Sequence, residues 1–116
     1  MSKIFELKPS SDTLHGFFSR ELKPALDIST GDTVIFQTLD SAWGIEERPG
    51  IGKPRRKFTG LSEERIHNQF GHALVGPIYV KGAQVGQTLE VKINEVIPGK
   101  YGWISAGGFP SYWIKR

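Results

Sequence analysis

The sequence predicts a mainly β fold: a single β-sandwich or barrel-like domain with one short helix, covering residues 1–116. Short apolar runs rich in β-branched and aromatic residues recur along the chain, and turn residues separate them. The 14 glycines and 7 prolines leave little room for long helices. A length of 116 residues and a hydrophobic content of 38% are typical of one globular domain and argue against intrinsic disorder.

The first expected strands lie in the N-terminal third. Ile4–Leu7 is a short extended run that Pro9 ends. Residues 24–28 form a further extended segment. Residues 32–39 follow the turn residue Gly31 and have the β-branched and aromatic content of a strand.

Two more strands are expected in the second half of the chain. Residues 77–80 form one, closed by a turn at Gly82. Residues 89–96 alternate apolar and polar side chains, which makes them the clearest strand in the sequence. The apolar side chains expected to face the core are Leu89, Val91 and Ile93.

The remaining segments are a short helix and a long loop. Residues 62–66 have Ser62 as a candidate N-cap and two glutamates directly after it, which predicts one or two helical turns. Residues 42–60 predict an irregular loop, of a length typical of functional or mobile segments.

Composition also limits the partners and the location. The net charge is +3, and its main basic run, residues 53–57, lies among prolines and glycines and carries no nucleic-acid-binding motif. We therefore expect a solvated loop and no nucleic-acid partner. No apolar segment approaches the roughly 20 residues of a membrane span, and no signal peptide is recognisable, so we expect no membrane partner and a cytoplasmic location. The absence of cysteine excludes disulfides, thiolate zinc sites and cysteine nucleophiles within these residues, and fits a reducing compartment.

The most informative stretch is residues 71–86, which place His72 just before a Gly76-Pro77-Ile78 strand entry and continue to Lys81-Gly82-Ala83. The other stretches that matter are His15-Gly16-Phe17-Phe18, Gly31-Asp32-Thr33-Val34, Asp40-Ser41-Ala42, Leu89-Glu90-Val91-Lys92-Ile93 and Tyr101-Gly102-Trp103. In order and spacing they resemble the N-terminal part of the acetamidase/formamidase family, whose members hydrolyse short amides to a carboxylic acid and ammonia. The resemblance covers roughly residues 12–113.

Two departures from the family pattern bear on function. The family's Pro-Gly-Asp turn is replaced by Val85-Gly86-Gln87. The family's later motifs, Gly-Gly-Asn-x-Asp and His-x-x-Gln-Gly-Asp-Gly-Glu, do not occur in these 116 residues. Because family members are roughly two domains long, the resemblance implies that this chain matches about half of the machinery. Completion is then expected from a homo-oligomer or from a complementary C-terminal chain.

Amide hydrolysis needs an activated nucleophile, and without cysteine a metal-bound water is the simplest choice. The resemblance implies catalytic roles for Asp40 and His72, and a divalent metal such as zinc held by Asp40, His72 and His15. Each residue also has a structural alternative. Asp40 would cap the turn that follows its strand, His72 would bond a backbone carbonyl, and His15 would be half buried beside two phenylalanines.

The remaining candidates have mainly structural interpretations. The third imidazole, His67, is expected on the surface of the short helix, and Trp43, Trp103 and Trp113 are expected as core or interface aromatics rather than a substrate cage. Two functions remain open. One is hydrolysis of small linear amides by a partial or split enzyme. The other is a non-catalytic truncated paralogue that binds a small ligand or a protein. The apolar residues expected to support self-association are Phe109, Tyr112, Trp113 and Ile114.

Overall fold

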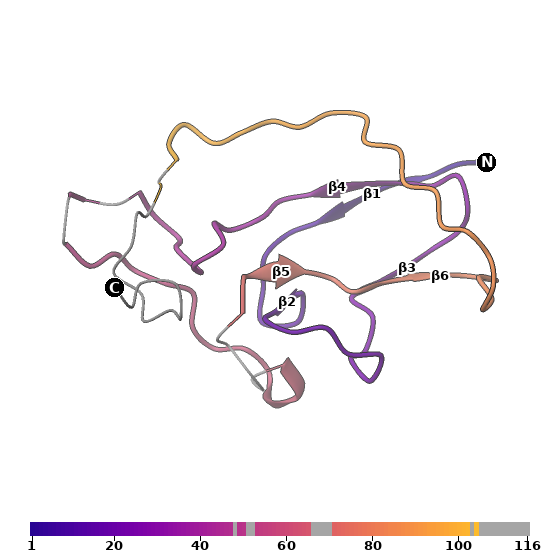
Figure 1. Ribbon diagram of the computed structural model, residues 1–116, viewed down its shortest axis with the longest axis horizontal. Coiled ribbons are helices and arrows are strands. Elements are labelled where there is room, and N and C mark those ends of the chain that lie inside the picture. The colour runs from indigo at the N-terminus through magenta and orange to yellow at the C-terminus, as the bar shows by residue number, and fades with distance from the viewer. Residues whose placement is uncertain (48, 51–52, 66–70, 103, 105–116) are drawn as a thin grey trace, which may run out of the picture.

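The computed structural model describes residues 1–47, 49–50, 53–65, 71–102 and 104. Three separate two-stranded sheets organise these residues (Figure 1). Strand β1 (Ile4–Leu7) pairs in parallel with β4 (Thr33–Phe36), and β3 (Leu26–Ile28) pairs in parallel with β6 (Ile78–Val80). Strand β2 (Leu14–His15) pairs antiparallel with β5 (Leu74–Val75).

The mainly β class is confirmed, since strands and extended segments dominate the described residues and their helical content is a single turn. That turn is a 3-10 helix, η1 (Glu63–Arg65), where residues 62–66 predicted a helix; Ile66 lies outside the described residues. The three strand pairs share no strand, and no closed barrel forms among the residues that the structure describes.

Four of the five expected strands occur at the predicted places. Strand β1 has the predicted bounds, whereas β3, β4 and β6 are shorter than their apolar runs. The two-residue strands β2 and β5 were not predicted, because two residues are too few to show an alternation. They pair through Leu14 opposite Val75 and His15 opposite Leu74.

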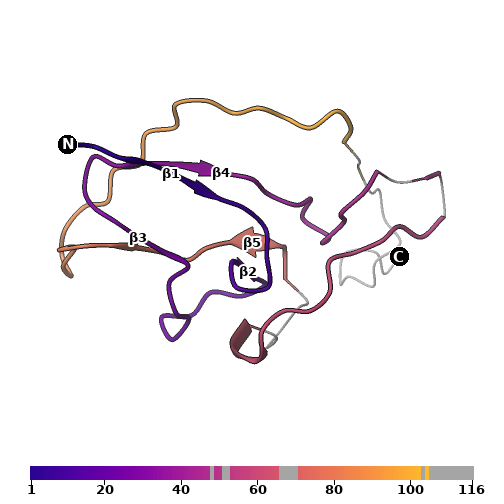
Figure 2. The ribbon, with the colours of Figure 1, turned by 180° about the vertical axis from the view of Figure 1, so that it is seen from behind.

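The prediction of a strand at residues 89–96 is wrong. After the Gln84–Gln87 turn, where Gln87 N–H bonds the Gln84 carbonyl, the chain runs along the outside of β1 and β4 without joining a sheet (Figure 2). The alternation is real, but a strand needs a neighbour for its backbone groups. None of the described residues supplies one.

The expected loop at residues 42–60 is more ordered than predicted. Gly44 and Lys57 form an antiparallel bridge, Phe58 N–H bonds the Trp43 carbonyl at 2.8 Å, and Ile45 N–H bonds the Arg56 carbonyl at 3.2 Å. The segment therefore folds back on itself as a loose hairpin, which brings residue 55 close to residue 40.

The apolar core is small. Leu14, Trp43 and Leu61 form its buried centre, with Leu39, Phe58, Ala73 and Val75 packed around it. The radius of gyration is 17.0 Å, against about 13 Å for a compact domain of this length. No helix among the described residues has the length and hydrophobicity needed to cross a bilayer.

Candidate functional site

Three stretches that carry the candidate site residues meet beside the core. Residues 13–16 pair with residues 74–76 through β2 and β5, extended by the Gly76 N–H bond to the Thr13 carbonyl at 2.8 Å. Ala73 N–H bonds the Ser41 carbonyl at 3.1 Å, which joins residues 71–76 to the segment after β4. The backbones that carry His15, Asp40 and His72 are therefore neighbours.

The segments that carry His15 and His72 touch at two glycines, Gly16 and Gly71. A Cβ atom added to Gly71 would overlap the carbonyl oxygen of Gly16, so the two chains touch backbone to backbone. The Gly71 carbonyl in turn accepts a hydrogen bond from the Trp43 indole at 2.9 Å. Only glycine at position 71 permits this contact, and it places His72 directly beside the segment that carries His15.

Asp40 forms a close ion pair with Arg55. Arg55 Nη2 donates to Asp40 Oδ1 at 2.8 Å, and Arg55 Nη1 lies 2.6 Å from Oδ2, outside hydrogen-bond alignment. The Arg55 side chain is 3% exposed and that of Asp40 is 17% exposed. The guanidinium thus lies against both carboxylate oxygens, the atoms with which Asp40 would bind a metal ion.

Asp40 also caps the turn that follows it. Its Oδ1 accepts hydrogen bonds from the backbone N–H groups of Ala42 at 2.8 Å and Gly44 at 3.4 Å, and its carbonyl accepts one from Trp43 N–H at 3.0 Å. Trp43 has a φ of +66°, an uncommon conformation for a bulky residue. These contacts match the structural alternative for Asp40, a turn cap after a strand.

His15 is buried, with 5% of its surface exposed, and is oriented by the backbone. Its Nδ1 lies 2.8 Å from the Phe17 carbonyl oxygen. Because a carbonyl only accepts, Nδ1 carries the proton, and in a neutral ring Nε2 is the basic nitrogen. That nitrogen faces the Gly76 backbone.

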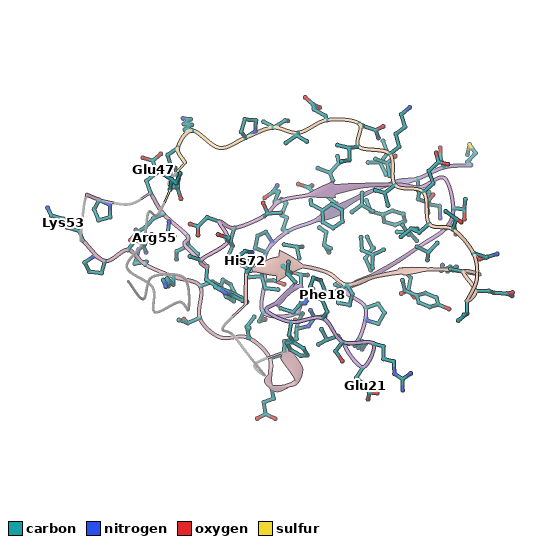
Figure 3. The ribbon with its side chains drawn as sticks, in the orientation of Figure 1. Phe18, Glu21, Glu47, Lys53, Arg55 and His72 are labelled. Carbon is teal, nitrogen blue, oxygen red and sulfur yellow. The ribbon has the colours of Figure 1, made fainter. Side chains whose placement is uncertain are left out.

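His72 has the opposite environment. Its side chain is exposed next to β5, as Figure 3 shows, and it makes no hydrogen bond or ion pair with any other described residue. The bond to a backbone carbonyl that was an alternative for His72 is made by His15 instead. Among the three candidates, His72 is the one open to a small molecule from solution.

The described residues do not assemble the expected metal centre. Within ranges 1–47, 49–50, 53–65 and 71–102, no three His, Asp or Glu side chains gather closely enough to hold a metal ion. The carboxylate of Asp40 is already taken by Arg55 and two backbone N–H groups. His67, Trp103 and Trp113 lie outside the described residues, as do Phe109, Tyr112 and Ile114.

Arg65 is a buried residue that the sequence did not single out. Its guanidinium is bonded by backbone carbonyls alone among the described residues: Nη1 to Gly76 at 2.7 Å and more weakly to Leu14 at 3.5 Å, and Nη2 to Lys23 at 2.8 Å. The residue is 5% exposed. Arg65 thereby fixes the strand pair that carries His15 relative to the segment entering β3.

The basic run at residues 53–57 is largely neutralised. Arg55 pairs with Asp40, and Arg56 Nε donates to Glu46 Oε2 at 2.8 Å. The Arg56 backbone N–H, which donates to Glu46 Oε1 at 2.6 Å, together with the Arg56 side chain lowers the pKa of Glu46. Lys53 and Lys57 are exposed and make no ion pair with other described residues, so the run presents two unpaired charges to solvent rather than four.

Sequence reasoning missed Arg55 and Arg65 for different reasons. In the sequence, Arg55 is one charge of a basic loop, and no local pattern indicates that it pairs with Asp40, 15 residues earlier. Arg65 read as the polar end of a helical turn. The sequence does place an aspartate at the end of a strand and an arginine in the following loop rich in turn residues. This combination is too common to predict an ion pair.

A shallow depression elsewhere on the chain is a separate feature. It measures about 570 Å³ and is lined by Lys23–Asp27 and Tyr79. None of Asp40, His15 and His72 borders it.

Comparisons with protein-family models, with curated proteins and with solved structures give no match for this chain.

Proposed function

We propose that this chain contributes the N-terminal domain of a hydrolase that acts on carbon–nitrogen bonds in small linear amides and releases ammonia. Polypeptide outside these 116 residues, on the same chain or another, would complete the site. The observation that carries the proposal is the close approach of Gly71 and Gly16. Each is the glycine next to a histidine in a stretch that resembles the amidase family, and their contact brings both stretches together.

The chain's own residues have distinct parts in this proposal. Hydrolysis adds water to the amide carbonyl and breaks the C–N bond, giving a carboxylic acid and ammonia, and the departing nitrogen must gain a proton. His72 is exposed beside the junction, and imidazole is the side chain most often used for proton transfer. Asp40, fixed by Arg55, would hold the neighbouring loop in place rather than touch substrate.

The β-sandwich expected from the sequence would arise only on completion. The three strand pairs share no strand, and apolar side chains remain exposed on β1 and β4, among them Ile4, Ile35 and Phe36. Additional strands that cover this surface would join the pairs into layers. A divalent metal such as zinc, if the completed enzyme uses one, requires ligands from outside the described residues.

The test combines metal analysis with ammonia release from formamide and acetamide. The purified chain is assayed alone and with a polypeptide that carries the Gly-Gly-Asn-x-Asp and His-x-x-Gln-Gly-Asp-Gly-Glu motifs, ideally one encoded beside it. We expect ammonia only from the mixture. His72→Ala should abolish ammonia release while the complex still forms, and Lys53→Ala is the matched exposed control. A stable complex that releases no ammonia would contradict the proposal.

The second candidate is a non-catalytic β-domain that binds a small ligand or a protein partner. The Asp40–Arg55 pair favours it, because the guanidinium binds the carboxylate that was expected to hold a metal ion for hydrolysis. The same experiment separates the two candidates, since a silent complex is the result that this alternative predicts.

A further inference from the structure

Residues 88–97, here called the arm, form an extended segment with no strand partner among the described residues. No backbone group of the arm bonds any other described residue, and none of its charged side chains is paired within the described part of the chain. The apolar side chains Leu89, Val91 and Ile93 are 74%, 71% and 74% exposed. A β-competent sequence with both edges open and an uncovered apolar face is a template for strand addition.

We propose that the arm pairs antiparallel with the arm of a second copy of this chain, about a two-fold axis at Val91. Identical strands that meet in this way form an isologous interface. In an antiparallel pair, directly opposite residues project to the same face. Val91 then faces its own counterpart, and Leu89 faces Ile93 of the other copy, so the six apolar side chains form one continuous stripe.

The charges select this register. With Val91 on the axis, Glu90 of each copy lies opposite Lys92 of the other, which gives two cross-strand pairs of opposite charge on the polar face. Thr88 lies opposite Asn94, so the polar face continues without a like-charge contact.

The neighbouring registers are worse. Moving the axis to Glu90 places the two Glu90 side chains opposite each other, and moving it to Lys92 does the same for the two lysines. A parallel pair in register also stacks like charges at both positions. A shift that exchanges odd and even positions places charged residues in the apolar stripe.

The proposal does not depend on the amide-hydrolase function. A strand has two edges, and self-pairing uses one edge of each arm, which leaves the other free for a different partner. Self-association also differs from amide hydrolysis in its readout, because it is measured on the chain alone without any substrate.

The first test is the mass of the purified chain in solution by light scattering or sedimentation over a range of concentrations. We expect a concentration-dependent shift from 12.9 kDa to about twice that mass. Glu90→Lys and Lys92→Glu each turn two attractive pairs into repulsive ones, and each should raise the dimer dissociation constant by about tenfold. Lys53→Glu makes the same charge change as Lys92→Glu at an exposed position remote from the arm and should leave the constant unchanged.

Mixing the two variants makes the test specific. Glu90→Lys chains have two lysines where Lys92→Glu chains have two glutamates, so an equimolar mixture should form a heterodimer although neither variant dimerises well alone. The double exchange E90K/K92E should restore the homodimer. These recoveries also separate a charge effect from simple misfolding.

The second test uses the absence of cysteine, which makes introduced thiols free of background. Val91→Cys should form a disulfide-linked dimer under mild oxidation, because paired Cα atoms across strands lie within disulfide range. Leu89→Cys should not, since its counterpart lies four residues along the strand, about 14 Å away. Leu89→Cys mixed with Ile93→Cys should cross-link. A chain that stays monomeric, or cross-linking that is equal at positions 89 and 91, overturns the proposal.

Discussion

Asp40 and Arg55 form an ion pair in which Nη2 lies 2.8 Å from Oδ1 and Nη1 lies 2.6 Å from Oδ2. With 3% of the arginine side chain and 17% of the aspartate side chain exposed, the pair is largely removed from water. The pair joins residue 40, which follows β4, to the second half of the hairpin that residues 42–60 form. Water screens such a pair poorly, so its loss is costly.

Arg55→Met should destabilise the fold strongly, because it leaves the Asp40 carboxylate without its cationic partner. We expect a loss of about 3–5 kcal/mol in the free energy of unfolding, measured by chemical denaturation. The double variant Asp40→Asn with Arg55→Met neutralises the unpaired carboxylate and should recover part of the loss. A double variant no more stable than Arg55→Met alone would contradict a charge-based explanation.

Arg65→Ala should be destabilising for a different reason. It removes the donors to the carbonyls of Lys23 and Gly76 and the weaker one to Leu14, and each bond from a charged donor contributes roughly 1.5–3 kcal/mol. Arg65→Lys keeps the charge but loses the planar fork that reaches separate acceptors. Thermal denaturation should therefore place the lysine variant well below the wild type. Equal melting temperatures for the lysine variant and the wild type would show that only the charge matters.

Gly71→Ala should lower stability by about 1–3 kcal/mol, the usual range for overpacking, because the new methyl group overlaps the Gly16 carbonyl. Gly102→Ala is the matched control, since a Cβ at that position meets nothing within 4 Å. Urea denaturation of both variants measures the difference. If the two substitutions cost the same, the close approach of residues 16 and 71 is not what holds these segments together.

Acid should weaken the contact between the N-terminus and the turn before β4. Asp32 accepts backbone hydrogen bonds from Ser29 and from Lys3, both at 2.8 Å, and these lower its pKa below the ordinary value of 3.8. The carboxylate therefore stabilises the fold above pH 3.8, and this contribution is lost as the pH falls through the lower folded-state pKa.

An NMR titration of the Asp32 side chain should give a pKa below 3.8 in the folded protein. Asp32→Asn should remove the matching part of the acid dependence of stability. Asp12→Asn is the control, because the Asp12 side chain makes no hydrogen bond or ion pair within the described residues. A normal pKa for Asp32 would show that these bonds do not persist in solution.

The reliability of the sequence predictions depended on how local each signal was. The runs that became β1, β3, β4 and β6 carry their own β-branched and aromatic pattern, so their positions were correct. The arm has the best pattern of all, yet it forms no strand, because pairing depends on a neighbour and not on the strand itself. The alternating pattern therefore shows that the arm is able to form a strand, but it does not show that the arm has a partner to form one with.

The candidate site was less predictable than the fold. The segments of His15, Asp40 and His72 do lie next to one another, but whether they act in hydrolysis stays a prediction. The partner of Asp40 was out of reach, because Arg55 approaches only after the loop folds back through the Gly44–Lys57 bridge. The neighbouring phenylalanines indicated partial burial of His15, whereas its full burial and the exposure of His72 follow from packing, which no spacing rule describes.

Among the described residues, the acceptors of Arg65 are all main-chain oxygens, and these exist whatever side chains occupy positions 14, 23 and 76. These hydrogen bonds therefore do not depend on the side-chain type at those three positions, although each residue must still pack. Only position 65 must remain arginine. A library randomised at positions 65 and 23 and selected for folded protein would keep arginine at 65 and tolerate polar groups at 23, whereas Leu14, buried in the core, and Gly76, with a φ of +138°, keep constraints of their own. At the junction between β2, β5 and β3, one side chain thus adds its bonds to the backbone bonds that already join these segments.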